Sequence, residues 1–215
     1  MALFITFEGI EGCGKSTQAA LLGNWLSLHG HQVSMTREPG GCPVSDRIRA
    51  ILLDPVNSSI TADTELFLYA AARAQHVAEV IGPALSRGET VICDRYIDAT
   101  LAYQGYARGL DLTRIRHLNF LAAGTIVPDL TLLLDFPVEL GVHRARQRNH
   151  DNATAHEGRF ECEALAFHQR VRDGYLQLAT EQPRIEVVDA RGDIDALHQR
   201  IVTVVEHHLQ QRNFS

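Results

Sequence analysis

Residues 9–16 (GIEGCGKS) restrict the possible folds of this chain more than any other segment, because they match the pattern GxxxxGK[ST]. Glycines let the backbone turn tightly, so that successive N–H groups point at phosphate oxygens, and a following helix adds its positive N-terminal end. The apolar run at 3–7 predicts a strand before the loop, and the helical spacing of apolar residues over 15–28 predicts a helix after it. Strand, glycine loop and helix in this order predict a site for the phosphates of ATP.

The predicted nucleotide site covers the whole glycine loop and the residue after it. Lys15 can reach the outer phosphates of ATP, and the hydroxyl of Ser16 can bind Mg²⁺. We therefore expect ATP as the phosphate donor, with Mg²⁺ bound beside it. The residues assigned to this site are Gly9, Ile10, Glu11, Gly12, Cys13, Gly14, Lys15, Ser16 and Thr17.

Length and composition limit what else the chain can be. A chain of 215 residues supports one substantial core, so we expect a single domain over 1–215 with at most a mobile lid. The net charge of −6 and the lack of a long basic stretch disfavour polynucleotide binding. No apolar run reaches the length of a membrane span, so we expect no membrane partner. Four cysteines without CxxC spacing indicate a reducing compartment, and we expect a cytoplasmic protein.

Strand and helix patterns alternate along the rest of the chain. Compact apolar runs predict further strands at 32–36, 90–93, 130–134 and 185–188. Helices are expected at 44–53, at 63–85 with a bend near Gly82-Pro83, and at 194–209. This order predicts an α/β P-loop NTPase fold, in which a parallel five-stranded sheet has helices on both faces and binds ligands at the carboxyl ends of its strands.

One segment lacks any periodicity. Residues 149–158 (NHDNATAHEG) lie between two helical patterns that carry several arginines. An ordinary surface loop is one interpretation of this segment. Loops of this length in compact domains are often lids, and the flanking arginines suit closure over a phosphate. We therefore expect a short lid at about 144–160.

Charged residues stand directly after two of the predicted strands. Asp94-Arg95-Tyr96 follows the third strand, and Arg37-Glu38 follows the second. Because the carboxyl ends of parallel strands meet at one edge, we expect Asp94 to help hold Mg²⁺ and Arg95 to grip a phosphate with two parallel hydrogen bonds. Arg37 is expected to bind the phosphate of a second, acceptor substrate, and a surface salt bridge with Glu38 is the alternative. A GTPase is disfavoured, because the chain lacks a guanine-reading NKxD sequence.

Several motifs follow one another at characteristic places in the chain. They are FEGIEGCGKST at 7–17, TREPGG at 36–41, AARAQH at 71–76, DRY at 94–96 with AYQG at 102–105, and RFE at 159–161 ahead of Tyr175. In this order they resemble the thymidylate kinase (dTMP kinase) family along nearly the whole chain. The resemblance implies transfer of the γ-phosphoryl group of ATP to dTMP, giving dTDP and ADP in dTTP biosynthesis, and it implies a homodimer.

The resemblance also implies an acceptor site. In this family the arginine matching Arg73 binds the thymine carbonyl, the aromatic residue matching Tyr69 stacks on the base, and the residue matching Thr100 accepts from thymine N3. An arginine donor suits O4 of thymine and opposes the amino group of cytosine. Tyr69 and Arg73 also lie four positions apart on a predicted helix, hence on one face. The expected substrate-binding residues are Glu11, Arg37, Tyr69, Arg73, Arg95, Thr100, Tyr103 and Gln104.

Two of these residues are expected at the sugar. Tyr103 resembles the tyrosine that crowds the 2′ position, and Glu11 matches an acid near the 3′-hydroxyl; simple packing in the core is the alternative for Tyr103. The chain departs from the family pattern at Ala99, where serine is common, and at Cys42, where threonine is common. Each departure removes a hydroxyl, so one hydrogen bond of the acceptor site is missing or carried by water.

The interior of the glycine loop contains no arginine. Some members of the family carry an arginine there, whereas others supply that charge from the lid, and the resemblance implies the lid type. Phosphoryl transfer depends mainly on alignment and on neutralising the charge of the transferred group, so positive side chains matter most. The expected catalytic residues are Lys15, Arg95, Arg148 and Arg159, with Arg144 and Arg146 as further candidates.

Two other functions stay open on these observations. The first is a kinase for another nucleoside monophosphate, which a panel of acceptors would distinguish. The second is a regulatory ATPase or nucleotide-dependent binding module that hydrolyses ATP without transferring the phosphoryl group. For that second function, release of ADP would not depend on dTMP.

Overall fold

Five parallel strands form one sheet in the computed structural model, which describes residues 2–151 and 158–213. The strands lie in the order β2-β3-β1-β4-β5, and every neighbouring pair is parallel. Their bounds are Phe4–Glu8 (β1), Val33–Arg37 (β2), Thr90–Asp94 (β3), Leu130–Asp135 (β4) and Ile185–Asp189 (β5). The five predicted strands and their parallel arrangement are confirmed.

Each strand runs one residue beyond its predicted end, and that last residue is charged in every case. At these ends Arg37 pairs in register with Asp94, and Asp135 pairs with Asp189. The prediction stopped each strand at its last uncharged residue, but the backbone ladder continues through the charged one. The sheet therefore presents a row of charged side chains at its carboxyl edge, where ligands bind in folds of this kind.

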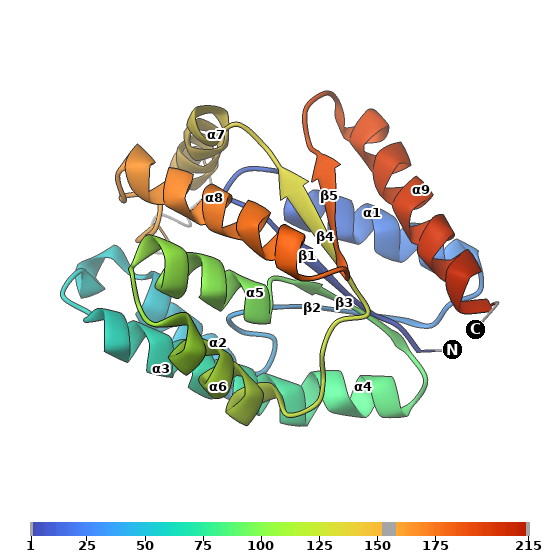
Figure 1. Ribbon diagram of the computed structural model, residues 1–215, viewed down its shortest axis with the longest axis horizontal. Helices are drawn as coiled ribbons and strands as arrows, with labels where there is room; N and C mark the ends of the chain where they lie inside the picture. Colours follow the sequence, from blue (N-terminus) through green and yellow to red (C-terminus); the bar gives the residue numbers. More distant parts are fainter. Residues whose placement is uncertain (1, 152–157, 214–215) are drawn as a thin grey trace.

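Helices cover both faces of the sheet. Figure 1 shows α1 (Lys15–Leu28) and α9 (Ile194–Asn213) side by side on one face. The opposite face carries α4 (Gly82–Ser86), α5 (Ile97–Thr100), α6 (Leu112–Ala123) and α8 (Leu165–Glu181). The remaining helices are α2 (Pro43–Leu53), the 3₁₀ turn η1 (Pro55–Asn57), α3 (Ala62–His76) and α7 (Val138–Asp151). Among the described residues, no helix combines the length and apolar character that a membrane crossing requires.

The single bent helix expected at 63–85 is wrong in detail. A π-helix, η2 (Val77–Ile81), separates α3 from α4, and the N–H of Gly82 bonds to the carbonyl of Val77, five residues back. Pro83 stands in the first turn of α4, where its missing N–H costs no hydrogen bond. A second π-helix, η3 (Leu101–Ala107), extends α5 and was not expected. Such segments are frequent at functional sites, and η3 carries two of the residues that line the cavity described below, Tyr103 and Gln104.

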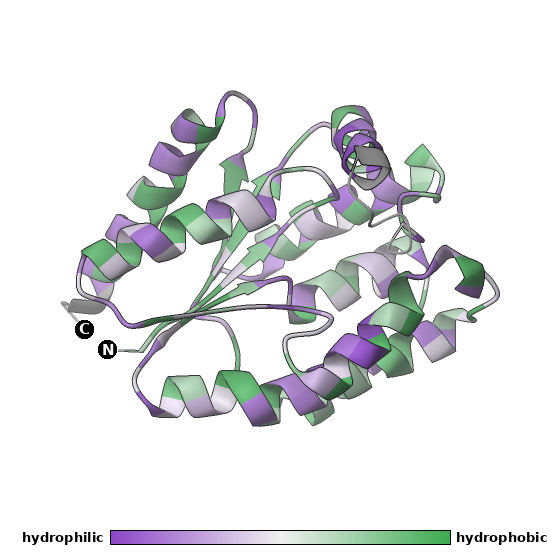
Figure 2. Cartoon of the chain, turned by 180° about the vertical axis from the view of Figure 1, so that it is seen from behind, coloured by the Kyte–Doolittle hydropathy of each residue, from purple (hydrophilic) through white to green (hydrophobic). Residues whose placement is uncertain are grey.

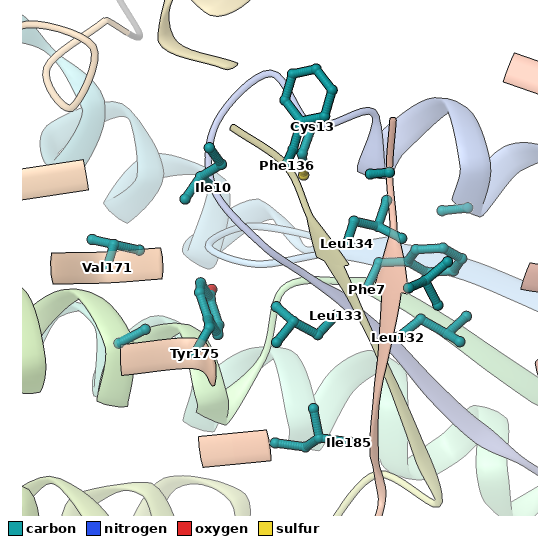
Figure 3. Packing of buried hydrophobic residues seen from close by; sticks show 14 of the residues in the cluster. Phe7, Ile10, Cys13, Leu132, Leu133, Leu134, Phe136, Val171, Tyr175 and Ile185 are labelled. Atoms are coloured by element: carbon teal, nitrogen blue, oxygen red, sulfur yellow. The ribbon is translucent and has the colours of Figure 1, made fainter. Parts of the chain in front are cut away.

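The core lies on both sides of the three central strands. All residues of β1 are buried, as are almost all of β3 and β4, whereas β2 and β5 at the edges are partly exposed. Figure 3 shows Phe7 and Leu132 packed together, with Val171 and Tyr175 of α8 facing the same cluster. In Figure 2 the strands are mostly hydrophobic, while the helices show hydrophilic residues on their outer sides. This distribution is typical of a sheet covered on both faces.

The glycine loop is fixed by contacts on its inner side. The side chains of Ile10 and Cys13 belong to the core, so only their backbone faces outward (Figure 3). Gly12 approaches α7 so closely that an added Cβ would lie 2.1 Å from the carbonyl oxygen of Gly141. Conversely, a Cβ at Gly141 would lie 2.6 Å from the carbonyl oxygen of Glu11. Loop and helix therefore meet backbone to backbone, which only glycine allows.

A buried polar cluster fixes the start of α5 against the sheet. The hydroxyls of Thr6 and Thr131 are 2.8 Å apart, and Arg184 donates to Thr131 at 2.6 Å. Arg184 also binds both carboxylate oxygens of buried Asp98 on α5, at 2.7 and 2.8 Å. The cluster sets the position of α5 and η3, and so of the site residues on them.

Replacing Arg184 with alanine is expected to destabilise the fold strongly. The change leaves the buried carboxylate of Asp98 without its cation, which costs about 3–5 kcal/mol in the free energy of unfolding. Urea denaturation measures this change. Arg191→Ala is the matched control, because its ion pair with Asp189 is exposed and should contribute little. Equal effects of the two changes would contradict the structural role of the cluster.

Candidate active site

A cavity of about 440 Å³ opens at the carboxyl edge of the sheet. Its wall combines the glycine loop, the ends of β2 and β3, one side of α3, the segment α5–η3 and residues beside the expected lid. The expected site residues on this wall are Glu11, Gly12, Gly14, Lys15, Ser16, Thr17, Arg37, Tyr69, Arg73, Asp94, Arg95, Thr100, Tyr103, Gln104 and Arg148. Four expected residues lie outside the described wall: Gly9, Ile10, Cys13 and Arg159.

Lys15 folds back over the glycine loop. Its Nζ atom donates to the carbonyl oxygens of Ile10 at 2.8 Å and Gly9 at 3.2 Å, and it lies 3.6 Å from Sγ of Cys13. These acceptors are neutral, so anionic phosphate oxygens would make stronger partners for the ammonium group. The position suits a lysine that is held close to the loop until a nucleotide binds.

Ser16 and Asp94 meet at the cavity wall. The Ser16 hydroxyl donates to Oδ2 of Asp94 at 2.6 Å. A hydroxyl and a carboxylate oxygen are donors that Mg²⁺ prefers, so this pair fits the ion expected from the sequence. Within the part of the chain that the structure describes, no three His, Cys, Asp or Glu side chains form a metal-binding group. The pair therefore fits an ion that takes its other ligands from the nucleotide and water.

Arg95 connects the glycine loop with two tyrosines. Its Nη1 atom donates to the carbonyl of Gly9 at 2.9 Å and to the Tyr175 hydroxyl at 3.1 Å. Its Nη2 atom donates to Oε1 of Glu11 at 3.1 Å and to the Tyr103 hydroxyl at 3.0 Å. These four bonds use all four Nη hydrogens, and Nε–H, which has no partner among the described residues, is available to donate to a phosphate. The two parallel hydrogen bonds to a phosphate expected from the sequence would require a phosphate oxygen to replace one of these four partners.

Glu11 receives hydrogen bonds on the side facing Arg95. Its Oε1 atom accepts from the Tyr103 hydroxyl at 2.6 Å as well as from Arg95, and its Oε2 atom lies 3.3 Å from Nδ1 of His168. Burial alone would raise the pKa of Glu11, but the positive charge of Arg95 and the imidazole of nearby His168 outweigh it. The pKa therefore lies far below its usual value of 4.5, and the carboxylate stays ionised.

Glu8 lies behind the same arginine and was not expected at the site. Its carboxylate accepts from the Tyr175 hydroxyl at 2.6 Å and from the backbone N–H of Tyr96 at 2.7 Å. The second bond supports the turn at Arg95, whose φ of 71° is unusual for a residue with a side chain. Burial, and next the negative charge of Asp98, raise the pKa of Glu8 to about 7.

Arg73 is almost completely enclosed. Its guanidinium donates to Oε2 of Glu38 at 2.8 Å, Oδ1 of Asn119 at 2.6 Å, the carbonyl of Tyr96 at 3.0 Å and the hydroxyl of Thr100 at 2.9 Å. One Nη1 hydrogen has no partner among the described residues. A single remaining donor in a buried position suits recognition of a single carbonyl oxygen.

The alternative ion pair of Arg37 with Glu38 is wrong. Glu38 binds Arg73 and also lies 3.1 Å from Nδ1 of buried His76, while Arg37 pairs with Asp46 at 3.1 Å. The Arg37–Asp46 pair is about half exposed and weak, so Arg37 can turn to an incoming phosphate at little cost. Glu38 is instead buried and held by Arg73 and His76.

The arginines beside the expected lid have different surroundings. Arg148 lines the cavity and lies 3.6 Å from Glu161, whereas Arg159 pairs with buried Glu65 at 2.7 Å and donates to the carbonyl of Leu52. The two further candidates are also engaged: Arg144 stacks on Phe136, and Arg146 donates to the carbonyl of Glu161. Residues 152–157, the middle of the expected lid, lie outside the described part of the chain.

Comparison with known proteins gives a clear family assignment. The sequence profile described as thymidylate kinase matches residues 7–201. The chain belongs to the thymidylate kinase family. It is 60% identical to the thymidylate kinase of Syntrophotalea carbinolica over 202 residues, which are 94% of each chain. It is 59% identical to that of Geobacter sp. strain M21 over 213 residues, covering 99% of this chain and 93% of the relative.

A solved member of the thymidylate kinase family has the same fold. The crystal structure of thymidylate kinase from Ehrlichia chaffeensis matches with a TM-score of 0.76 at 34% identity. The match covers 95% of this chain and 98% of that one. The predicted P-loop NTPase fold is therefore confirmed for this thymidylate kinase family member.

Several residues of this thymidylate kinase site were not expected from sequence. Glu38 stands inside the TREPGG motif, so its place at the strand end was a visible signal, but its partner Arg73 lies far along the chain. Tyr175 was seen as part of a motif without a role. Glu8 stands inside the FEGIEGCGKST motif and directly follows the first predicted strand, so its position was also a visible signal, but it was given no role. Asn119 and His168 gave no signal, since each looks like an ordinary helix residue.

The raised pKa of Glu8 predicts a pH-dependent stability. Between about pH 4.5 and 7 the folded protein keeps a proton that the unfolded chain has released, so stability falls as the pH rises and levels off above 7. A shift from 4.5 to about 7 corresponds to a loss on the order of 3 kcal/mol. Urea unfolding of wild type and Glu8→Gln at several pH values measures it, since the variant lacks this titration. A stability difference between them that is independent of pH would contradict the prediction.

Proposed function

We propose that this member of the thymidylate kinase family transfers the γ-phosphoryl group of ATP to dTMP, giving dTDP and ADP in dTTP biosynthesis. The observation that carries the proposal is one cavity lined by the phosphate loop at one part of its wall and by Arg73 at another. A phosphate site and a base-reading arginine in one cavity suit two nucleotides that react directly.

On the donor side, the proposal assigns the phosphates of ATP to the backbone of residues 9–17. Lys15 exchanges its carbonyl partners for phosphate oxygens and neutralises the outer phosphates. Ser16 and Asp94 would hold Mg²⁺, which when bound neutralises charge on the β- and γ-phosphates. Ile10 and Cys13 contribute their backbone alone, because their side chains are buried in the core.

On the acceptor side, the phosphate of dTMP is assigned to Arg37 and Arg95. Arg37 is free to leave its exposed ion pair, and Arg95 offers Nε–H without losing its four other bonds. The rigid hold on Arg95 fixes the direction from which the phosphate is bound. Such preorganisation supports in-line transfer, because little has to be rearranged during the reaction.

The nucleoside is assigned to the enclosed part of the wall. The remaining Nη1 hydrogen of Arg73 suits O4 of thymine, and Tyr69 suits stacking on the base. Burial raises the pKa of Tyr69 above its usual value, so the ring stays neutral. Tyr103 and Glu11, already hydrogen-bonded to one another, are assigned to the 2′ and 3′ positions of the sugar.

The lid charge is assigned first to Arg148 and second to Arg159. Arg148 lines the cavity, and its ion pair within the described residues is a long contact with Glu161, so little in this part of the chain holds it away from a phosphate. Arg159 has to leave Glu65 and the carbonyl of Leu52 before it can reach the cavity. Both keep a proposed catalytic role together with Lys15 and Arg95.

The proposal extends to the assembly and setting of the enzyme. We expect a homodimer, which is supported by exposed apolar side chains such as Phe67 on α3 and Phe120 and Leu121 on α6. We also expect a cytoplasmic enzyme whose partners are dTMP and ATP, without polynucleotide or membrane. The net charge of −6 and the free cysteines support this setting.

Release of ADP should depend on dTMP. With ATP and Mg²⁺ present, a coupled assay is expected to show strong ADP release on adding dTMP and little without it. dCMP and AMP should support far less release, because Arg73 opposes the amino group at C4 of cytosine and at C6 of adenine. ADP release that does not depend on dTMP would indicate a regulatory ATPase. An acceptor that supports faster ADP release than dTMP would indicate a kinase for another nucleotide.

The two arginines beside the lid should differ when each is replaced by alanine. Arg148→Ala is expected to lower kcat by about 10²–10³-fold with little change in KM for dTMP, because it removes charge stabilisation in the transition state. Arg159→Ala is expected to lower kcat and also the free energy of unfolding, since Glu65 then loses a buried partner. Steady-state kinetics and urea denaturation of both variants measure these effects. An unchanged kcat would remove the affected arginine from the catalytic set.

A further inference from the structure

Glu65 on α3 lies at the centre of a buried network behind the cavity. Only 1% of this residue is exposed. Its Oε2 atom lies 2.7 Å from Nη2 of Arg159 and accepts from Nη2 of Arg108 at 3.3 Å. Its Oε1 atom accepts from Nε2 of Gln104 at 2.8 Å and from Nε of Arg108 at 3.3 Å. Four donor contacts from three side chains therefore converge on one carboxylate.

This network determines which way the amide of Gln104 faces. An ionised carboxylate only accepts hydrogen bonds, so the amide group that faces Glu65 has to be the NH₂ group. The carbonyl oxygen of Gln104 then lies on the other side of the amide and accepts no hydrogen bond from the described residues. Gln104 lines the cavity, so the polar atom that it has available for a ligand is an obligate acceptor.

An obligate acceptor can distinguish pyrimidines that a hydroxyl cannot. Thr100, four positions before Gln104 on the same helical segment, also lines the cavity, but its hydroxyl can donate or accept by rotating. A hydroxyl can therefore serve the N3–H of thymine and the bare N3 of cytosine alike. A fixed carbonyl oxygen attracts N3–H and repels the lone pair of cytosine N3, which leaves two buried acceptors facing each other.

We propose that Glu65 is a positioning residue for base specificity, which holds the Gln104 carbonyl oxygen as an acceptor toward the N3 edge of the acceptor base. The inference rests on the proposed transfer to dTMP. Glu65 itself touches no substrate, and it acts through the orientation of one amide. Arg73 opposes the exocyclic amino group of cytosine, and Glu65 adds a second, independent discrimination at N3.

Glu65→Gln tests this orientation. The two arginine contacts at the Oε2 side favour the oxygen of the new amide there, so its NH₂ group faces Gln104. Gln104 then turns to accept, and its own NH₂ group faces the cavity. The ratio of kcat/KM for dTMP to that for dCMP is expected to fall by about tenfold or more, the effect of one mispaired hydrogen bond.

dUMP is the internal control for the same variant. It shares O4 and N3–H with dTMP, so the ratio of kcat/KM for dTMP to that for dUMP should stay constant. Glu163→Gln is the matched control variant, because it removes the other ion pair of Arg108, at 2.6 Å, without contacting Gln104. The ratio of dTMP to dCMP should be unchanged in this control. A purely structural role for Glu65 would lower kcat/KM for all three acceptors in parallel, and that result would overturn the proposal.

Gln104→Met gives an answer even if Glu65→Gln fails to fold. Methionine fills similar space without an acceptor at the base edge, so the ratio of dTMP to dCMP should again fall. An unchanged ratio in a folded Gln104→Met variant, checked by circular dichroism, would overturn the proposal. A wild-type enzyme without preference for dTMP over dCMP would instead overturn the proposed function itself. The two failures are therefore distinguishable.

Discussion

The site depends on the guanidinium of Arg95, which ties together segments from distant parts of the chain. Through four hydrogen bonds it joins the glycine loop, η3 and α8, and two tyrosines extend these bonds to Glu8 and Glu11. A charged group can be buried only when its hydrogen-bonding capacity is met. The position of Arg95 is therefore fixed by the same contacts that permit its partial burial, and the phosphate loop is fixed with it.

Two further arginines at or near the cavity are also held by a carboxylate and neutral groups. Arg73 is buried against Glu38, and Arg159 against Glu65, so each of these arginines meets a carboxylate from another element. In both cases neutral groups take up most of the remaining N–H donors or pack against the guanidinium. The chain thus holds its cations in defined directions with few donors to spare. Under the proposed function, selectivity would come from the hydrogen-bond donor or acceptor that each network leaves unpaired for a ligand.

Much of the fold could be predicted from the chain alone, because apolar runs and the glycine loop report local structure directly. The five strands and α1 could be predicted in this way, and the family motifs identified most of the residues that line the cavity. The interruption of the expected helix 63–85 by η2 could not be predicted, since the change from four-residue to five-residue hydrogen bonds leaves the apolar pattern almost intact. The ion-pair partners of the charged residues could not be predicted either. Arg37 and Glu38 are neighbours in sequence, yet burial joins Glu38 to Arg73 and leaves Arg37 to Asp46.

The contact between Gly12 and Gly141 has a mechanical consequence. Because the two backbones touch without any intervening side chain, the beginning of α7 and the phosphate loop have to move as one rigid body. The expected lid begins at about residue 144, barely one helical turn further on. A hinge for this lid therefore has to lie beyond Gly141. Closure of the expected lid would then move Arg148 relative to the cavity while the phosphate loop keeps its position.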